Sequence, residues 1–160
     1  YEGTTGVQAL DLLGRKVLLG KLKSFNEFHA VVKSFIKEHQ NRSEMKHMMK
    51  QLKRYLLRWR LGTLRIAYMA RKDRDMVGAA SVDYLMFSGY VMMAYFWARM
   101  ADSAYSGLKQ ANGDMSFYRA KIHTAEFYFD RLLPRAKGHA KMMVKSPKTL
   151  MQMPEEHFQL

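Results

Sequence analysis

Apolar residues recur at helical intervals along most of the chain. In residues 7–19 and again in 24–39 they fall on one side of a helix with 3.6 residues per turn. Gly20 predicts the end of the first helix. Ser24, followed by Glu27 three residues later, has the spacing of a capping box and predicts the start of the second.

A third helix is expected from about residue 44 into the region of residues 72–74, and its pattern is clearly two-faced. The apolar face holds Met45, Met48, Leu52, Tyr55, Leu56, Trp59, Thr63, Ile66 and Ala70. The opposite arc holds Lys46, Lys50, Lys53, Arg54, Arg58, Arg60, Arg65, Arg71 and Lys72.

The fourth helix, expected over residues 75–106, has no charge between Tyr84 and Ala98 and is apolar nearly all round. Such a helix is typical of the centre of a bundle, covered by neighbours on several sides. A fifth helix is predicted over residues 114–133, with Asp114 as its N-cap. Pro134 is expected to kink this helix rather than end it. The inner side is predicted to carry Phe117, Tyr118, Ile122, Ala125, Phe129 and Leu132.

These elements predict an all-α fold, an antiparallel helical bundle of four long helices preceded by a short helix. Residues 147–160, which follow Ser146, are interpreted as an extended tail. The chain has no cysteine, which excludes disulfides and thiolate metal sites. It begins without the pattern of a signal peptide, and its longest uncharged run is shorter than the roughly 20 residues that span a bilayer. We therefore expect a soluble protein.

The first eight residues carry the chemically informative motif, Tyr1-Glu2-Gly3-Thr4-Thr5-Gly6-Val7-Gln8. By themselves, these residues are most simply a loop with a solvated Glu. Together with the helix that follows and with Asp83-Tyr84-Leu85 and Trp97-Ala98-Arg99-Met100, however, they resemble the end of the acyl-CoA dehydrogenase catalytic domain and the extra C-terminal helical domain of long bacterial members. The resemblance implies that residues 1–23 are a remnant of the catalytic domain and 24–146 the added bundle.

The resemblance also implies a chemistry for the intact protein, the α,β-dehydrogenation of an acyl-CoA thioester with FAD. Glu2 matches the catalytic base, Gly3 a position that the substrate passes closely, and Thr4, Thr5 and Gly6 a segment that touches FAD. A base of this kind needs an apolar pocket that raises its pKa toward the working pH. Electron-transfer flavoprotein is the implied acceptor, and a cytoplasmic homo-oligomer the implied assembly. The fragment alone is expected to be inactive and structural, because most of the active site would precede Tyr1.

Two further patterns have plainer interpretations than a ligand site. Glu44 and His47 have the E-x-x-H spacing of di-iron bundles, but such sites need two copies of the motif, so a capping Glu beside an exposed His is favoured and no metal site is predicted. The Met and aromatic side chains of the fourth helix are expected mostly in the core, with an interface as the lesser alternative. This group comprises Met86, Met92, Met93, Phe96 and Trp97.

The net charge of +13 leaves a second functional class open. Residues 44–74 hold ten Lys or Arg against two acids, a basic face without interleaved aromatic residues. A basic helical module that binds a polyanion, either DNA or an anionic membrane, is the alternative. We favour a solvated face, or one that docks against an acidic surface of the parent enzyme, over nucleic acid or membrane binding.

Overall fold

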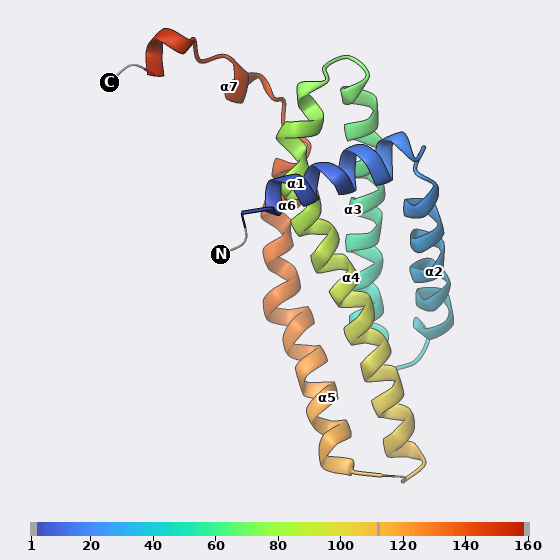
Figure 1. Cartoon of the computed structure of the whole chain (residues 1–160). Coiled ribbons are helices and arrows are strands. Elements are labelled where there is room, and N and C mark those ends of the chain that lie inside the picture. The colour runs from blue at the N-terminus through green and yellow to red at the C-terminus, as the bar shows by residue number, and fades with distance from the viewer. Residues whose placement is uncertain (1–2, 112, 159–160) are drawn as a thin grey trace.

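The computed structural model describes residues 3–111 and 113–158, which form an antiparallel bundle of helices (Figure 1). No strand occurs within these described residues. Successive long helices run in opposite directions, as short connections require. The predicted all-α bundle of four long helices behind a short one is therefore confirmed. Its long members are α2 (Lys23–His39), α3 (Lys46–Ala70), α4 (Asp75–Lys109) and a rod made of α5 (Met115–Phe127) and α6 (Ala136–Met142).

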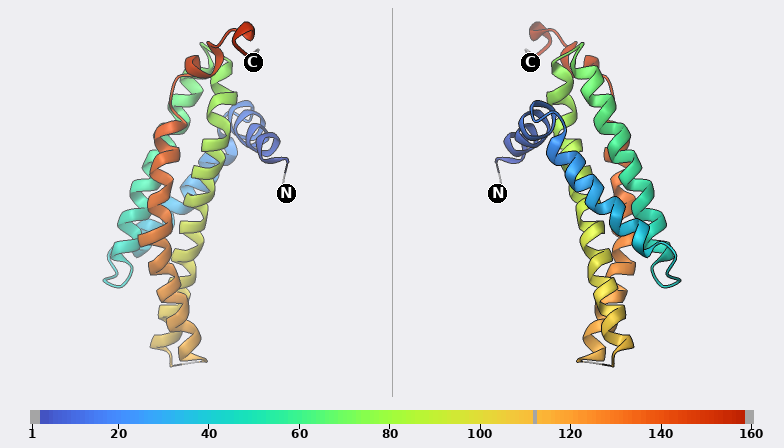
Figure 2. Two further views of the ribbon diagram at one scale, coloured as in Figure 1. Left: turned by 90° about the vertical axis from the view of Figure 1, so that its left-hand side faces the viewer. Right: turned by 90° about the vertical axis from the view of Figure 1, so that its right-hand side faces the viewer.

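The first helix lies across the bundle instead of along it. It begins as α1 (Thr5–Leu10) and continues as the π-helix η1 (Asp11–Leu19). Ala9, Leu13 and Val17, spaced four residues apart, are buried, and both segments contact α4. In the side views α1 stands on one side of the bundle, whereas α3 and α6 lie on the other (Figure 2).

The turn between η1 and α2 differs from the predicted capping box. Lys21 and Leu22 both have positive φ, and the Leu22 N–H donates to the Val17 carbonyl at 2.8 Å. Helix α2 starts at Lys23, with Leu22 as N-cap and without a side-chain capping bond. The prediction that Ser24 caps this helix is wrong. Leu22 is half-buried against the core, and its packing sets the start of the helix one residue before Ser24.

Helix α3 has the two faces that its sequence predicts. Its buried side holds nearly every apolar residue expected there, and Thr63 is fully buried among them. Helix α2 adds Phe25, Val32 and Ile36 to the same core. The rings of Phe25 and Trp59 meet edge to face at 5.1 Å, which joins α2 to α3.

Helix α4 is the centre of the molecule and contacts α1, α3, α5 and α6. By length and composition alone it could cross a membrane, a test that core helices of soluble proteins also pass. Two of its carboxylates are engaged by partners from other segments: Asp83 by His139 and Asp102 by Arg42. These two contacts, a hydrogen bond with His139 and an ion pair with Arg42, belong to a helix that packs among its neighbours.

The last rod begins and bends where its sequence predicts. The Asp114 carboxylate accepts hydrogen bonds from the Ser116 and Phe117 N–H groups at 2.8 and 3.1 Å, which confirms the N-cap. At Pro134 the chain passes through the π-helix η2 (Tyr128–Leu132) and the 3-10 turn η3 (Leu133–Arg135), then continues as α6. The expected kink is confirmed. Phe117, predicted on the inner side, is exposed because only α4 runs beside this end of α5 (Figure 1).

The tail leaves the bundle at its upper end and projects away from it (Figure 1). It is not extended throughout, since it forms the short helix α7 (Lys148–Met151) and the 3-10 turn η4 (Glu155–Phe158).

Candidate functional site

The structure places four of the five predicted site residues at the start of α1. Gly3 and Thr4 form a turn, and Thr5 and Gly6 are the first residues of the helix. The Gln8 N–H donates to the Thr4 carbonyl at 2.9 Å, and the Gln8 amide donates to Thr4 Oγ1 at 3.4 Å. Glu2 lies outside the described residues, so its predicted role as base stays a prediction.

The glycines of this segment face open space. A Cβ atom built on Gly3 or Gly6 would meet no atom within 4 Å. Packing within the described chain therefore gives no reason for glycine at either position. The surroundings leave room for a molecule that approaches the backbone closely, the requirement that the motif predicts for Gly3.

The buried residues of this segment are Ala9, Leu13 and Val17, through which it packs on α4, and an exposed ion-pair cluster lies within η1 itself. Asp11 forms ion pairs with Arg15 and, at 3.4 Å, with Lys16. The hydrogen bond from Arg15 lowers the pKa of the Asp11 carboxyl, while desolvation opposes it. Val7 and Leu10, on the outer side of α1, are exposed apolar side chains. The site segment is thus held against α4 with an apolar side still uncovered.

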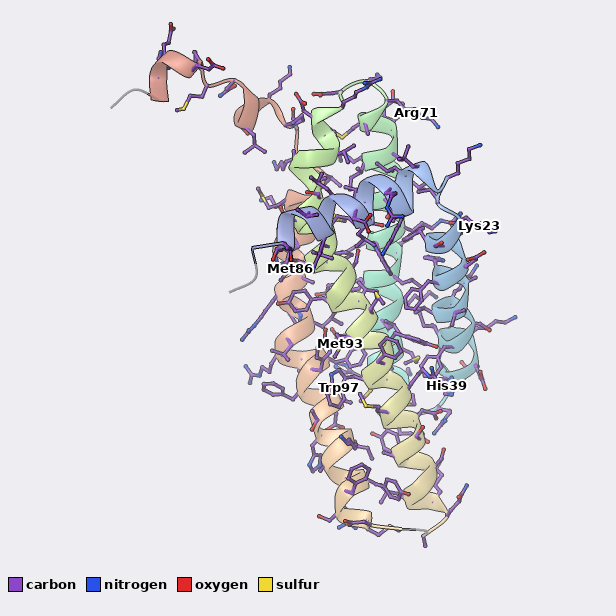
Figure 3. The ribbon with its side chains drawn as sticks, in the orientation of Figure 1. Lys23, His39, Arg71, Met86, Met93 and Trp97 are labelled. Atoms are coloured by element: carbon purple, nitrogen blue, oxygen red, sulfur yellow. The ribbon has the colours of Figure 1, made fainter. Side chains whose placement is uncertain are left out.

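An uncovered apolar strip also runs along α4. Met86, Met92, Met93 and Phe96 are between 38% and 46% exposed, and only Trp97 of the predicted group is half-buried. The prediction that most of them pack in the core is wrong. Figure 3 shows Met86 and Met93 on α4 below the crossing of α1. The flanking helices cover the sides of α4, and α1 covers only its upper part, which leaves this strip free for an interface.

The E-x-x-H motif does not assemble as a metal site. Glu44 accepts hydrogen bonds from Lys109 at 2.7 Å and from Arg42 at 3.2 Å. The Lys109 contact is the largest cause that lowers the pKa of Glu44 to about 2. His47 instead faces Asp130 on η2, at 2.8 Å between Nε2 and Oδ1. The predicted capping role of Glu44 is wrong as well, since α3 has no side-chain capping bond.

The Glu44 network joins the connection between α2 and α3 to α4. Arg42 joins Glu44 to Asp102 on α4, and His39 Nε2 lies 3.2 Å from Asp102 Oδ2. His39 Nδ1 in turn lies 2.8 Å from the Phe35 carbonyl oxygen. These carboxylates are committed to structural ion pairs. Among the residues that the structure describes, no group of three or more His, Cys, Asp or Glu could hold a metal ion.

The outer face of α3 is more apolar than the sequence suggested. Leu57, Leu61, Leu64 and Tyr68 recur four, three and four residues apart and are all exposed. The interpretation of this face as free of aromatic residues is wrong, because Tyr68 lies on it with the Lys72 ammonium 4.9 Å from its ring centroid. The cations surround this stripe. The helix contains no Asp or Glu, and no Lys or Arg of α3 has a described carboxylate oxygen within 4.0 Å.

Comparison with known proteins gives a consistent result. A family described as acetyl-CoA dehydrogenase C-terminal like matches residues 25–154. The chain is 29% identical over 134 residues to a 3-methylmercaptopropionyl-CoA dehydrogenase of Ruegeria pomeroyi, a match that covers 83% of this chain and 23% of that protein. It is 25% identical over 166 aligned positions to the broad-specificity linear acyl-CoA dehydrogenase FadE5 of Mycobacterium tuberculosis, covering 99% of this chain and 27% of that protein. The chain spans about a quarter of the length of these relatives.

Proposed function

Because this chain belongs to the acetyl-CoA dehydrogenase C-terminal-like family, we propose that it is the C-terminal part of an FAD-dependent enzyme that α,β-dehydrogenates an acyl-CoA thioester. The observation that carries the proposal is the family match over residues 25–154, directly behind a segment with the spacing of the catalytic-loop motif. The full-length protein is the active form, and the chain by itself contributes structure.

The proposed roles follow the motif. Glu2 takes the proton from the carbon next to the thioester carbonyl, and Gly3 leaves room for the substrate. Thr4, Thr5 and Gly6 lie against FAD, which would serve as the hydride acceptor when it is bound. The open space around Gly3 and Gly6 fits such close approach. Burial by the rest of the enzyme would give Glu2 the dry surroundings in which a carboxylate becomes a base near neutral pH.

The bundle offers an apolar side to the rest of the enzyme. Val7 and Leu10 on α1 and the strip around Met86 and Met93 on α4, the helix that α1 contacts, are exposed apolar surfaces. We propose residues 1–23 as the end of the catalytic domain, 24–146 as a bundle that covers it, and 147–160 as a tail. Electron-transfer flavoprotein as acceptor, a homo-oligomeric assembly and a bacterial cytoplasmic location complete the proposal.

The test uses the complete polypeptide that contains this chain. We expect it to carry flavin absorbance that an acyl-CoA bleaches. Glu2→Gln should retain the flavin but lose turnover by a factor of about 10² to 10⁴, the usual contribution of a positioned base. Glu27→Gln is the matched control, because Glu27 is exposed on α2 and lies outside the motif of residues 1–8. A complete protein without flavin would refute the proposal, and undiminished turnover in Glu2→Gln would refute the role of Glu2.

A further inference from the structure

A groove of about 470 Å³ runs between α2 and α3. Its floor is apolar and includes Ile36 and Leu56, which are both buried. At one end the rings of Phe25 and Phe28 pack against Trp59 and hold the two helices together. The volume is within the range of about 300–1,000 Å³ that is usual for small-molecule sites.

Four cations line the groove, two from each helix. Lys33 and Lys37 are one turn apart on α2, whereas Lys53 and Arg60 are two turns apart on α3. None of the four has a carboxylate oxygen within 4.0 Å among the described residues. Like charges around one groove repel one another, and a multiply charged anion between them would relieve that repulsion.

His29 adds a buried polar group to the groove wall. The residue is only 9% exposed, and its ring makes no hydrogen bond within the described part of the chain; its nitrogens are not among the fully buried unpaired atoms, so they remain accessible from the groove. Burial lowers the pKa of this imidazole, and the charges of Arg60 and Lys33 lower it further. An anion beside the ring would raise the pKa of His29, because it stabilises the imidazolium.

We propose that this groove binds a phosphate monoester that carries an apolar body, with Lys33, Lys53 and Arg60 around the phosphate. Ile36 and Leu56 contact the body, and His29 donates a hydrogen bond to a phosphate oxygen. A phosphate is favoured over a carboxylate because its two charges neutralise more of the cluster. Alkyl phosphates, nucleotides with a terminal phosphate and phospholipid headgroups share this chemistry. The inference does not depend on the proposed redox function.

The primary measurement is calorimetric titration of the chain with octyl phosphate below its micellar concentration. Inorganic phosphate and octanoate serve as partial ligands, the first without a body and the second with a single charge. We expect octyl phosphate to bind at least about tenfold more tightly than either, since each lacks one set of contacts. Proton NMR of His29 should show its titration moving to higher pH when octyl phosphate is bound, as the dianion offsets Lys33, Lys37, Lys53 and Arg60.

Charge-matched variants distinguish binding in this groove from general electrostatic attraction of an anion to a basic protein. Lys33→Gln with Lys53→Gln should weaken octyl phosphate binding by about tenfold or more. Lys137→Gln with Lys141→Gln removes the same charge from the cleft between α3 and α6, on the other side of α3, and should leave the affinity unchanged. Circular dichroism of both variants checks that the bundle is intact. Equal losses in the two variants would overturn the proposal.

Two further arms identify the source of the phosphate. Coenzyme A that competes with octyl phosphate and shifts the His29 titration would assign the site to a nucleotide-type ligand. Vesicles with phosphatidic acid that compete while coenzyme A does not would assign it to a lipid headgroup. No octyl phosphate binding, or binding that leaves the His29 titration unmoved, would refute the groove as a phosphate site.

Discussion

Tyr84 and Thr63 connect the two central helices through one buried hydrogen bond of 3.1 Å between their hydroxyl oxygens. Thr63 Oγ1 donates its hydrogen to the Trp59 carbonyl at 2.8 Å, so Tyr84 is the donor toward Thr63. Burial raises the pKa of the Tyr84 hydroxyl, which keeps it protonated for this task. The two hydroxyl groups thus lie in the core between α3 and α4, and each makes a hydrogen bond there.

Asp114 is the clearest single-residue contribution at the surface. Asp114→Ala should lower the free energy of unfolding by about 1 kcal/mol, because two N–H groups at the start of α5 lose their acceptor. Urea denaturation followed by circular dichroism measures the change. Asp114→Asn, which keeps an acceptor oxygen, is the control, and an alanine variant as stable as the parent would contradict the capping role.

Glu44 should make the free energy of unfolding depend on pH in the acidic range. Its pKa is about 2 in the folded chain against 4.5 for the ordinary carboxyl, so its contribution is fully present above pH 4.5 and is lost as the pH falls toward 2. We expect the difference in urea midpoint between the parent and Glu44→Gln to be larger at pH 7 than at pH 2.5. A difference that stayed constant over this range would exclude the ion pairs with Lys109 and Arg42 as its origin.

At the scale of the element, α4 contains glycines whose surroundings differ sharply. A Cβ atom at Gly78 would meet nothing within 4 Å, whereas one at Gly107 would lie 2.5 Å from ring atoms of Tyr118. The same substitution therefore has opposite consequences along one helix. Close packing of α5 on α4 explains Gly107, and nothing in the described chain requires Gly78.

Gly78→Ala should stabilise the chain by about 0.5–1 kcal/mol, because alanine has the higher helix propensity. Gly107→Ala should destabilise it, since the rigid Tyr118 ring must move and the propensity gain near the helix end at Lys109 is small. Thermal unfolding of the two variants gives the comparison. Stabilisation by both substitutions would show that Tyr118 is not packed against Gly107 in solution.

At the scale of the whole molecule, the exposure of the apolar strip of α4 is expected to differ between the isolated chain and the enzyme proposed to contain it. In the chain by itself Met93 is 46% exposed and contributes little to folding. In the complete protein the same side chain would be covered if the strip is an interface. Stability of the two forms should therefore respond differently to one substitution.

Met93→Gln should change the unfolding free energy of the isolated chain by less than about 0.5 kcal/mol, as is usual for surface positions. It should lower the melting temperature of the complete protein, where an amide would replace an apolar contact. Phe129→Ala, at a fully buried core position, is the positive control and should cost about 3–5 kcal/mol in the chain itself. An unchanged melting temperature of the complete protein would exclude Met93 from the interface.

The sequence by itself determined the elements and their order. Helical periodicity located each long helix, and local chemistry identified the Asp114 cap and the bend at Pro134, because these depend on neighbours within a few residues. The family resemblance was likewise carried by sequence, and the family match confirms it. The site residues beginning at Glu2 stay predictions, since Glu2 lies outside the described residues and no cofactor or substrate contact of Gly3, Thr4, Thr5 or Gly6 is observed.

Only the tertiary structure decided which apolar and charged side chains remain free. Composition could not tell that Met86 and Met93 are exposed, because exposure depends on how far α1 and the flanking helices extend over α4. The start of α2 was set by packing of Leu22 rather than by Ser24. The groove between α2 and α3 joins His29 to Arg60 across thirty-one positions of sequence, a proximity that arises only when two amphipathic helices pack.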